Sequence, residues 1–151
     1  MVDPLDLDAG KSAWARYAEG SAGRDPIKFL ARAIKLTAGD EGHGRLAIDL
    51  GCGAGNEALA LLQKGWKVHA IDSEPRAIEL LESMVGDDVR SRLTTQVGAF
   101  DEVDLPMADL VFASLSLPFA GDKHHASVRR ALAAVKPGGW FVGVLFGHND
   151  T

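Results

Sequence analysis

The spacing of the apolar positions changes near residue 45. Upstream, apolar side chains recur every three or four residues, which places them on one face of a helix. This pattern predicts one helix from Lys11 to Glu19 and a second that begins near Pro26 and ends at Gly39. The apolar face of the second helix is predicted to comprise Ile27, Leu30, Ala31 and Ile34. We expect residues 1–44 to form an N-terminal helical cap segment and residues 45–151 an α/β core, within a single domain.

Downstream of residue 45, short apolar runs alternate with helical patterns. The predicted strands are Leu46–Leu50, Trp66–Ile71, Leu93–Val97, Ala108–Ser114 and Trp140–Phe146. Strands this apolar, separated by helices, are typical of a mainly parallel sheet covered on both faces. Right-handed crossovers then give a doubly wound α/β fold, with a ligand crevice at the carboxyl end of the first strand.

Three helical patterns lie between these strands. The first runs from Asn56 to Lys64. The second follows Ser73, a residue type that caps helices. The third precedes the fifth strand, with Asp122 as its expected cap. Its predicted apolar stripe comprises Val128, Ala131, Leu132 and Val135.

The first strand runs into three glycines at alternate positions, Gly51, Gly53 and Gly55. A sharp strand-to-helix turn needs residues that tolerate positive φ and carry no side chain that would block a ligand. About 20 residues further on, Asp72 closes the second strand, where a carboxylate can accept both hydrogen bonds of a ribose diol. These features favour a nucleoside-bearing cofactor. The alternative is that the glycines only permit tight packing and Asp72 only caps a helix.

The spacing of the glycines separates two classes of cofactor. In the dinucleotide fingerprint the third glycine stands one place later, where this chain has Asn56. Asp49 directs a carboxylate at the pocket, which would repel a pyrophosphate but suits an amino group and a sulfonium. The turn therefore favours S-adenosylmethionine over NAD, and the acid at Asp72 disfavours the 2′-phosphate of NADP.

Leu46–Gly55 resembles motif I of class I S-adenosylmethionine-dependent methyltransferases, and Lys136–Phe141 resembles the turn before their fifth strand. Within this family the chain is most similar to small-molecule enzymes of the tellurite-resistance and thiopurine type. The resemblance implies a Rossmann-like methyltransferase fold with strand order 3-2-1-4-5 and S-adenosyl-L-methionine as cofactor. It also implies in-line methyl transfer to a small-molecule acceptor. The family's C-terminal strands are expected to be missing, because the chain stops at Thr151. Either the chain is a fragment, or a partner such as a second copy in a homodimer covers the edge of the fifth strand.

The resemblance implies which residues bind the cofactor. Gly51 and Gly53 would line its methionine portion near Asp49, while Asp72 and Ser73 would hold the ribose. Ala99 stands where the family usually has an acid, so its backbone and the ring of Phe100 are the expected adenine contacts. The full predicted set is Asp49, Gly51, Cys52, Gly53, Asp72, Ser73, Ala99, Phe100, Ser114 and Tyr17. Within it, Cys52 is interpreted as a small packing residue.

The segment Ser114–Phe119, at the end of the fourth strand, faces the transferable methyl group in this family. It lacks the Asn/Asp-Pro-Pro-aromatic motif of enzymes that methylate nucleic-acid bases, which favours a small, mostly apolar acceptor pocket. Ser114 and Ser116 either orient an acceptor or bond nearby backbone. No catalytic residue is assigned, because alignment alone can promote transfer to a lone pair. His148 and Asp150 are the remaining candidates for a base.

Two features of the N-terminal segment have two interpretations each. Trp14 and Tyr17 either fold over the cofactor as a lid or anchor their helix in the core. Arg24 either reaches the cofactor carboxylate or lies exposed in a loop. No metal is expected, because Cys52 is the single cysteine and His124-His125 resembles no ligand set.

Composition narrows the class of protein. With 46% hydrophobic and 25% charged residues, the chain is typical of a soluble globular protein. Its net charge of −5 argues against nucleic-acid binding, and its apolar runs are too short to cross a membrane. The acidic N-terminus lacks a signal-peptide pattern, so we expect a cytoplasmic protein. The alternatives to an enzyme of this class are a non-catalytic S-adenosylmethionine-binding or regulatory protein and, less favoured, an NAD-dependent oxidoreductase.

Overall fold

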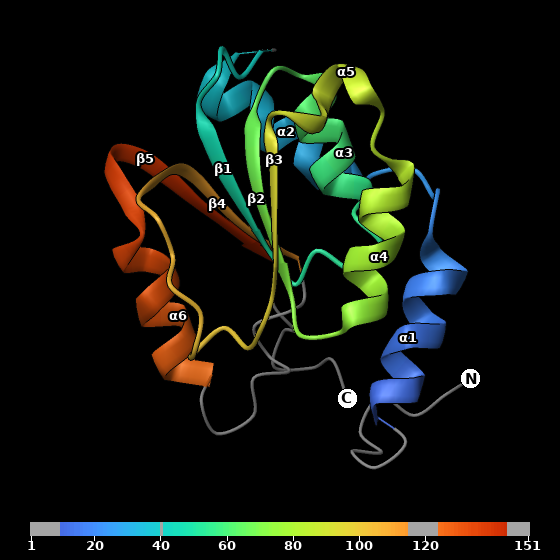
Figure 1. Ribbon diagram of the computed structural model, residues 1–151. Helices are drawn as coiled ribbons and strands as arrows, with labels where there is room; N and C mark the ends of the chain where they lie inside the picture. The colour runs from blue at the N-terminus through green and yellow to red at the C-terminus, as the bar shows by residue number, and fades with distance from the viewer. Residues whose placement is uncertain (1–9, 40, 115–123, 145–151) are drawn as a thin grey trace.

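A five-stranded parallel sheet forms the centre of the molecule (Figure 1). The computed structural model describes residues 10–39, 41–114 and 124–144. Its strands are β1 Leu46–Leu50, β2 Lys67–Asp72, β3 Leu93–Val97, β4 Ala108–Ser114 and β5 Val135–Val144. Their order is β3-β2-β1-β4-β5, with every neighbouring pair parallel. The predicted doubly wound α/β fold and strand order are confirmed.

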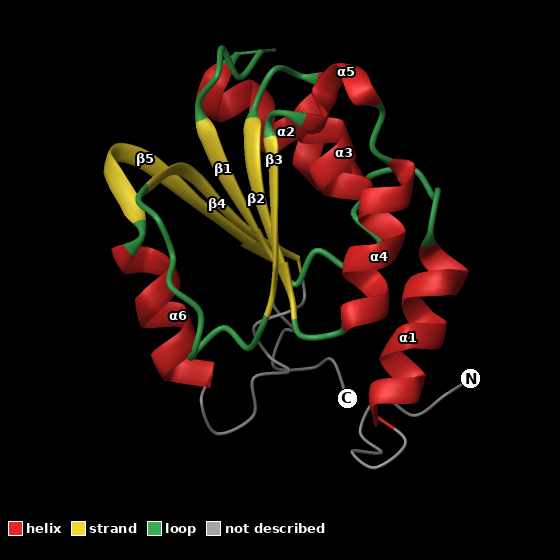
Figure 2. Ribbon diagram, viewed as in Figure 1, coloured by secondary structure: helices red, strands yellow, loops and turns green. Residues whose placement is uncertain are grey.

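Helices cover both faces of this sheet (Figure 2). They are α1 Gly10–Ser21, α2 Lys28–Ala38, α3 Asn56–Gln63, α4 Pro75–Met84, α5 Asp87–Arg90 and α6 His124–Ala133. Helices α2, α3 and α4 bury their apolar sides on one face, and α6 buries its own on the other. Helix α1 lies against the outer side of α4. None of the helices in the described ranges combines the length and apolarity that a bilayer crossing requires.

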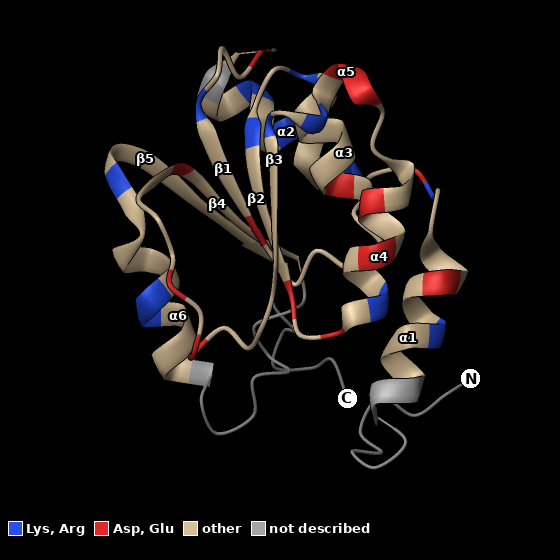
Figure 3. Cartoon of the chain, viewed as in Figure 1, with Lys and Arg blue, Asp and Glu red and all other residues tan. Residues whose placement is uncertain are grey.

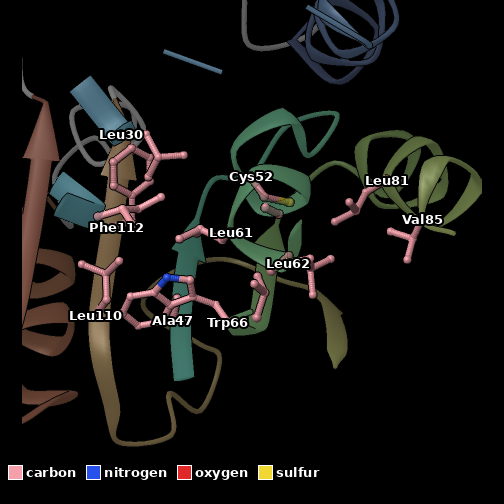
Figure 4. Close-up of a cluster of buried hydrophobic side chains, with 14 of the residues drawn as sticks. Leu30, Ala47, Cys52, Leu61, Leu62, Trp66, Leu81, Val85, Leu110 and Phe112 are labelled. Atoms are coloured by element: carbon pink, nitrogen blue, oxygen red, sulfur yellow. The ribbon is translucent and has the colours of Figure 1, made fainter. Parts of the chain in front are cut away.

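The alternation of side chains along β4 explains why this strand lies inside the sheet. Leu110 and Phe112 pack on the side of α2 and α3, while Val111 and Ala113 pack on the side of α6. All four side chains are fully buried. Figure 4 shows the ring of Phe112 beside Leu30 of α2. A strand apolar on both sides is stable only between two covered faces, as in a parallel sheet.

Two helix starts differ from the prediction. Ser73 does not cap α4; it is exposed, and Glu74 takes the capping position by accepting a hydrogen bond from the Arg76 backbone N–H at 3.1 Å. Pro75 then begins the helix, because its missing N–H would have no partner there. Helix α2 begins at Lys28 rather than Pro26. Its buried face holds Ala33 in place of Ala31, which is exposed.

The fifth strand begins earlier than predicted, at Val135 instead of Trp140. Val135 pairs with Ala108 and Trp140 pairs with Leu110, so the residues between form a bulge. Gly138 supports it with a φ of +80°. Val135 therefore belongs to the strand, not to a helical stripe, and Leu132 of α6 is half-exposed. The predicted cap Asp122 and the strand end Phe146 lie outside the described residues.

Replacing Phe112 with Ala is expected to lower the free energy of unfolding by about 3–5 kcal/mol, because the ring is fully buried. Trp140, which is 47% exposed, provides the control: Trp140→Ala should cost less than about 1 kcal/mol. Urea denaturation followed by circular dichroism measures both. Similar losses for the two variants would contradict the assignment of Phe112 to the core.

Candidate functional site

The glycine turn and Asp72 meet at the carboxyl edge of the sheet, where β1 and β2 end. The backbone N–H groups of Gly51 and Cys52 donate to the carbonyl of Ile71 at 2.8 and 3.0 Å. Gly51, Gly53 and Gly55 have φ values of +71°, +54° and +88°. Side chains disfavour this left-handed region, so the shape of the turn requires glycine.

The second and third glycines of the turn face different surroundings. A Cβ atom at Gly55 would lie 2.8 Å from Cγ and 2.9 Å from Cβ of Leu81, so close packing against α4 excludes a side chain there. A Cβ atom at Gly53 would meet nothing within 4 Å. Gly55 therefore serves the packing of the fold. Gly53 exposes backbone that a ligand can approach.

Asp72 fastens this turn to the end of β2. Its Oδ2 accepts the backbone N–H of Gly53 at 2.8 Å, and its Oδ1 accepts that of Glu74 at 2.9 Å. Burial raises the pKa of Asp72, while the hydrogen bonds from Glu74 and Gly53 act in the opposite direction. Each carboxylate oxygen keeps a further lone pair, so the group can accept more hydrogen bonds where it is exposed.

Asp49 lies near the end of β1 and is only 2% exposed. By the alternation of the strand it shares the side of Ala47, which α2 and α3 cover. Its Oδ2 is buried and has no hydrogen-bond partner within the described part of the chain. Burial raises the pKa of Asp49 well above its usual value, and the carboxylates of Glu57 and Asp72 raise it further; Arg24 acts in the opposite direction. Such a group is costly unless a donor or a cation reaches it.

Two buried polar residues at the start of α3 hold the link between α1 and α2. The side chain of Asn56 accepts the Gly23 N–H and donates to the Ser21 carbonyl, both at 3.0 Å. The carboxylate of Glu57 accepts from Arg24 Nη1 at 2.8 Å and from the Ile27 N–H at 3.3 Å. The N-terminal segment is thereby fastened directly beside the glycine turn.

Sequence reasoning missed Glu57 and saw in Asn56 only a departure from the dinucleotide fingerprint. The signal for Glu57 was a charged residue followed at once by the apolar run Ala58–Leu62. The exposed-loop interpretation of Arg24 holds only in part, because its side chain is 41% exposed yet paired with Glu57, and a contact with the cofactor carboxylate stays a prediction. Acidic positions gather where β1 and β2 end and α3 begins (Figure 3). This surplus of carboxylates suits a positively charged ligand and disfavours a pyrophosphate.

The remaining predicted residues differ in burial, and all except Tyr17 stand at or just after the carboxyl ends of β2, β3 and β4. Tyr17 is 61% exposed on α1 and makes an edge-to-face contact with Trp14, so it is not a core anchor. Phe100 is partly buried against the α6-side core. Ala99 directs its carbonyl to the N–H groups of Glu102 and Val103. Ser73 is exposed, and Ser114 ends β4 half-buried opposite Val144.

The side chain of Cys52 adds little to the chemistry of this site. Cys52 is buried within the turn, and burial raises the pKa of its thiol well above the usual value, which disfavours a reactive thiolate. Within the described ranges, no group of three metal-ligating side chains comes together. Ser116, His148 and Asp150 lie outside the described residues.

Comparison with known proteins places this geometry in a family context. Residues 47–139 match the family model described as a methyltransferase domain. The chain is 27% identical to methyltransferase tpcM of Aspergillus fumigatus, over 91% of this chain and 42% of that protein. It is 26% identical to magnesium-protoporphyrin O-methyltransferase of Rhodobacter capsulatus, over 85% of this chain and 62% of that protein. The chain thus spans less than two thirds of either relative.

The fold is also that of solved methyltransferase structures. The glycopeptide N-methyltransferase MtfA, complexed with S-adenosyl-L-methionine, superposes with a TM-score of 0.66 over 80% of this chain and 54% of that one. The two sequences are 20% identical. At this level the likeness concerns the fold.

The different roles of Gly53 and Gly55 predict different effects on stability. Gly55→Ala is expected to lower the free energy of unfolding by about 2–4 kcal/mol, because it adds a clash with Leu81 to backbone strain. Gly53→Ala carries the strain alone, about 1 kcal/mol. Chemical denaturation of both variants checks this, and a greater loss for Gly53→Ala would show that the packing has been misassigned.

Because the pKa of Asp49 is raised in the folded protein, the unfolded chain loses this proton at a lower pH than the folded protein does. The contribution of Asp49 to stability is therefore present below about pH 4 and falls as the pH rises above it. Without ligand, Asp49→Asn should be more stable than the wild type at pH 7, because the amide carries no charge to desolvate. The difference should shrink as the pH falls toward about 4. Urea denaturation across this range measures it; a difference independent of pH would contradict the prediction.

Proposed function

The chain belongs to the methyltransferase-domain family, and from this premise we propose that it binds S-adenosyl-L-methionine and transfers its methyl group to a small-molecule acceptor. The observation that carries the proposal is the buried, unpartnered Oδ2 of Asp49 near a turn whose Gly53 faces open space. A carboxylate in this state gains most from a cationic partner. The methionine end of the cofactor brings an ammonium and a sulfonium.

The same edge of the sheet offers partners for the rest of the cofactor. In this proposal Gly51, Cys52 and Gly53 line the methionine portion with their backbone. Asp72 holds the ribose through lone pairs that its bonds to Gly53 and Glu74 leave unused, and exposed Ser73 flanks it.

The adenine and the mouth of the site involve elements further along the chain. Ala99 and Phe100, both partly buried, follow β3 and are the proposed adenine contacts. Tyr17 is exposed on α1, which favours a lid over a core anchor. We therefore propose that its ring folds over the cofactor. Ser114, at the end of β4, borders the acceptor.

Methyl transfer from a sulfonium depends more on the alignment of the two reactants than on proton transfer by the protein. The bound cofactor supplies an electrophilic methyl group on sulfur with a good leaving group. In this proposal the chain's residues fix the direction in which the acceptor approaches the methyl group and exclude water. Such alignment corresponds to an effective concentration of the acceptor of about 10⁵ M or more. No general base is assigned, and an amine, thiol or other acceptor with a lone pair needs none.

A small-molecule acceptor fits the acidic character of the chain, whose net charge is −5. The relatives named above include enzymes for a magnesium-protoporphyrin and for a glycopeptide, so the family name leaves the acceptor open. Closer similarity to tellurite-resistance and thiopurine enzymes, a cytoplasmic location and a homodimer stay predictions from the sequence.

Titration calorimetry with S-adenosylhomocysteine and with NAD tests the binding proposal. We expect binding of the first ligand and none of the second. Asp72→Asn should weaken S-adenosylhomocysteine at least about 10-fold, through loss of a charged hydrogen bond to the ribose. Asp109→Asn is the matched control, since Oδ2 of Asp109 accepts the Leu46 backbone N–H at 2.9 Å, at the amino end of β1 and away from the turn. Equal affinity for wild type and Asp72→Asn would remove Asp72 from the ribose site.

Methyl transfer itself is tested with a panel of thiols, amines and phenols, using a radiolabelled methyl group. Turnover of any panel member supports the enzyme. Tight binding without turnover across the panel would favour a non-catalytic binding protein.

A further inference from the structure

The ion pair between Arg24 and Glu57 leaves the neighbouring carboxylate of Asp49 unpaired. Arg24 Nη1 lies 2.8 Å from Glu57 Oε1 and also donates to the Asp25 carbonyl at 2.8 Å. Asp49 is the more deeply placed acid, yet its Oδ2 has no partner within the described residues. Arg24 is near enough for its positive charge to lower the pKa of Asp49. The guanidinium is therefore within electrostatic reach of both acids, and its ion pair in the described part of the chain is with Glu57.

Stability does not explain why Glu57 is a glutamate. Its side chain is only 6% exposed, so the charge is costly to desolvate, and an ion pair in such a place seldom yields a net gain. Glu57 also lies close enough to Asp49 to raise the pKa of that carboxyl by repulsion. A neutral residue would avoid both costs. Local conflicts of this kind are typical of functional sites.

We propose that Glu57 is a positioning residue that holds Arg24 away from Asp49, so that the Asp49 carboxylate stays available for the ammonium end of the cofactor. The inference rests on the proposed function. It adds Glu57 as the residue that keeps Arg24 paired with itself and not with Asp49. Glu57 is suited to this role because the Ile27 N–H, at 3.3 Å, also holds its carboxylate in place. Without the charge of Glu57, the buried Asp49 carboxylate, whose pKa the charge of Arg24 already lowers, would attract the guanidinium, and a pair between them would compete with the ligand.

Two ligands separate this effect from general damage to the site. S-adenosylhomocysteine has the amino-acid end that Asp49 is proposed to bind, and 5′-methylthioadenosine has the same nucleoside and sulfur without it. Glu57→Gln keeps an oxygen for the Ile27 N–H and removes the charge. We expect it to weaken S-adenosylhomocysteine about 10-fold and to leave methylthioadenosine unchanged, as measured by calorimetry.

A second substitution provides the decisive result. Adding Arg24→Gln to Glu57→Gln removes the competitor, so affinity for S-adenosylhomocysteine should return to within about 3-fold of the wild type. Arg24→Gln alone should bind at least as tightly as the wild type, which keeps the test valid if Glu57→Gln does not fold. Glu19→Gln is the matched control: it breaks another ion pair of the N-terminal segment, with Arg76 at 2.9 Å, and should change neither affinity.

The outcomes are distinguishable. If Glu57→Gln binds S-adenosylhomocysteine like the wild type, or if the double variant is no better than Glu57→Gln, Glu57 has no positioning role. If Arg24→Gln alone weakens S-adenosylhomocysteine selectively, Arg24 contacts the cofactor and the inference is wrong, while the proposed function stands. If the wild type binds neither ligand, the proposed function and this inference fail together.

Discussion

The hydrogen bond from the Gly53 N–H to the Asp72 carboxylate joins the two strand ends on which the site depends. It acts together with the bonds from Gly51 and Cys52 to the Ile71 carbonyl, so the turn after β1 is fixed to β2 rather than to its own strand. A turn held in this way cannot collapse into the space beside it. Backbone therefore stays open at Gly53, where a ligand can approach.

The carboxylates around this turn include one, Asp49, whose charge destabilises the protein when no ligand is bound. Asp49, Glu57 and Asp72 place three carboxylates together, and burial and mutual repulsion raise the pKa of Asp49. Asp49, whose Oδ2 has no partner within the described residues, would be less costly as a neutral residue. A cationic ligand reverses the balance, because the same negative charges then stabilise it in a medium of low dielectric constant. Binding of a cation would therefore account for carboxylates that are costly in the empty protein.

Much of the fold could be predicted from the sequence because its strands are continuous apolar runs between polar turns. β1, β3 and β4 begin and end at the predicted residues. β5 does not, since its Lys-Pro-Gly-Gly segment has the composition of a turn and forms a bulge between Val135 and Trp140, which both pair with β4. Ser73 likewise matched a local preference for caps, but Pro75 fixed the start of the helix so that Glu74 caps it.

The part of the site that the sequence did not disclose depends on contacts between distant residues. The glycines and Asp72 follow a spacing rule, whereas Glu57 meets Arg24 across 33 positions, and Asn56 meets Gly23 across as many. Neither partner has a local signature. These contacts make the N-terminal segment part of the site: without it, Asn56 and Glu57 would be polar groups at the start of α3 with nothing to hold. The glycine turn and the link after α1 therefore form one unit, and the pairing of Arg24 decides which charge that unit offers to a ligand.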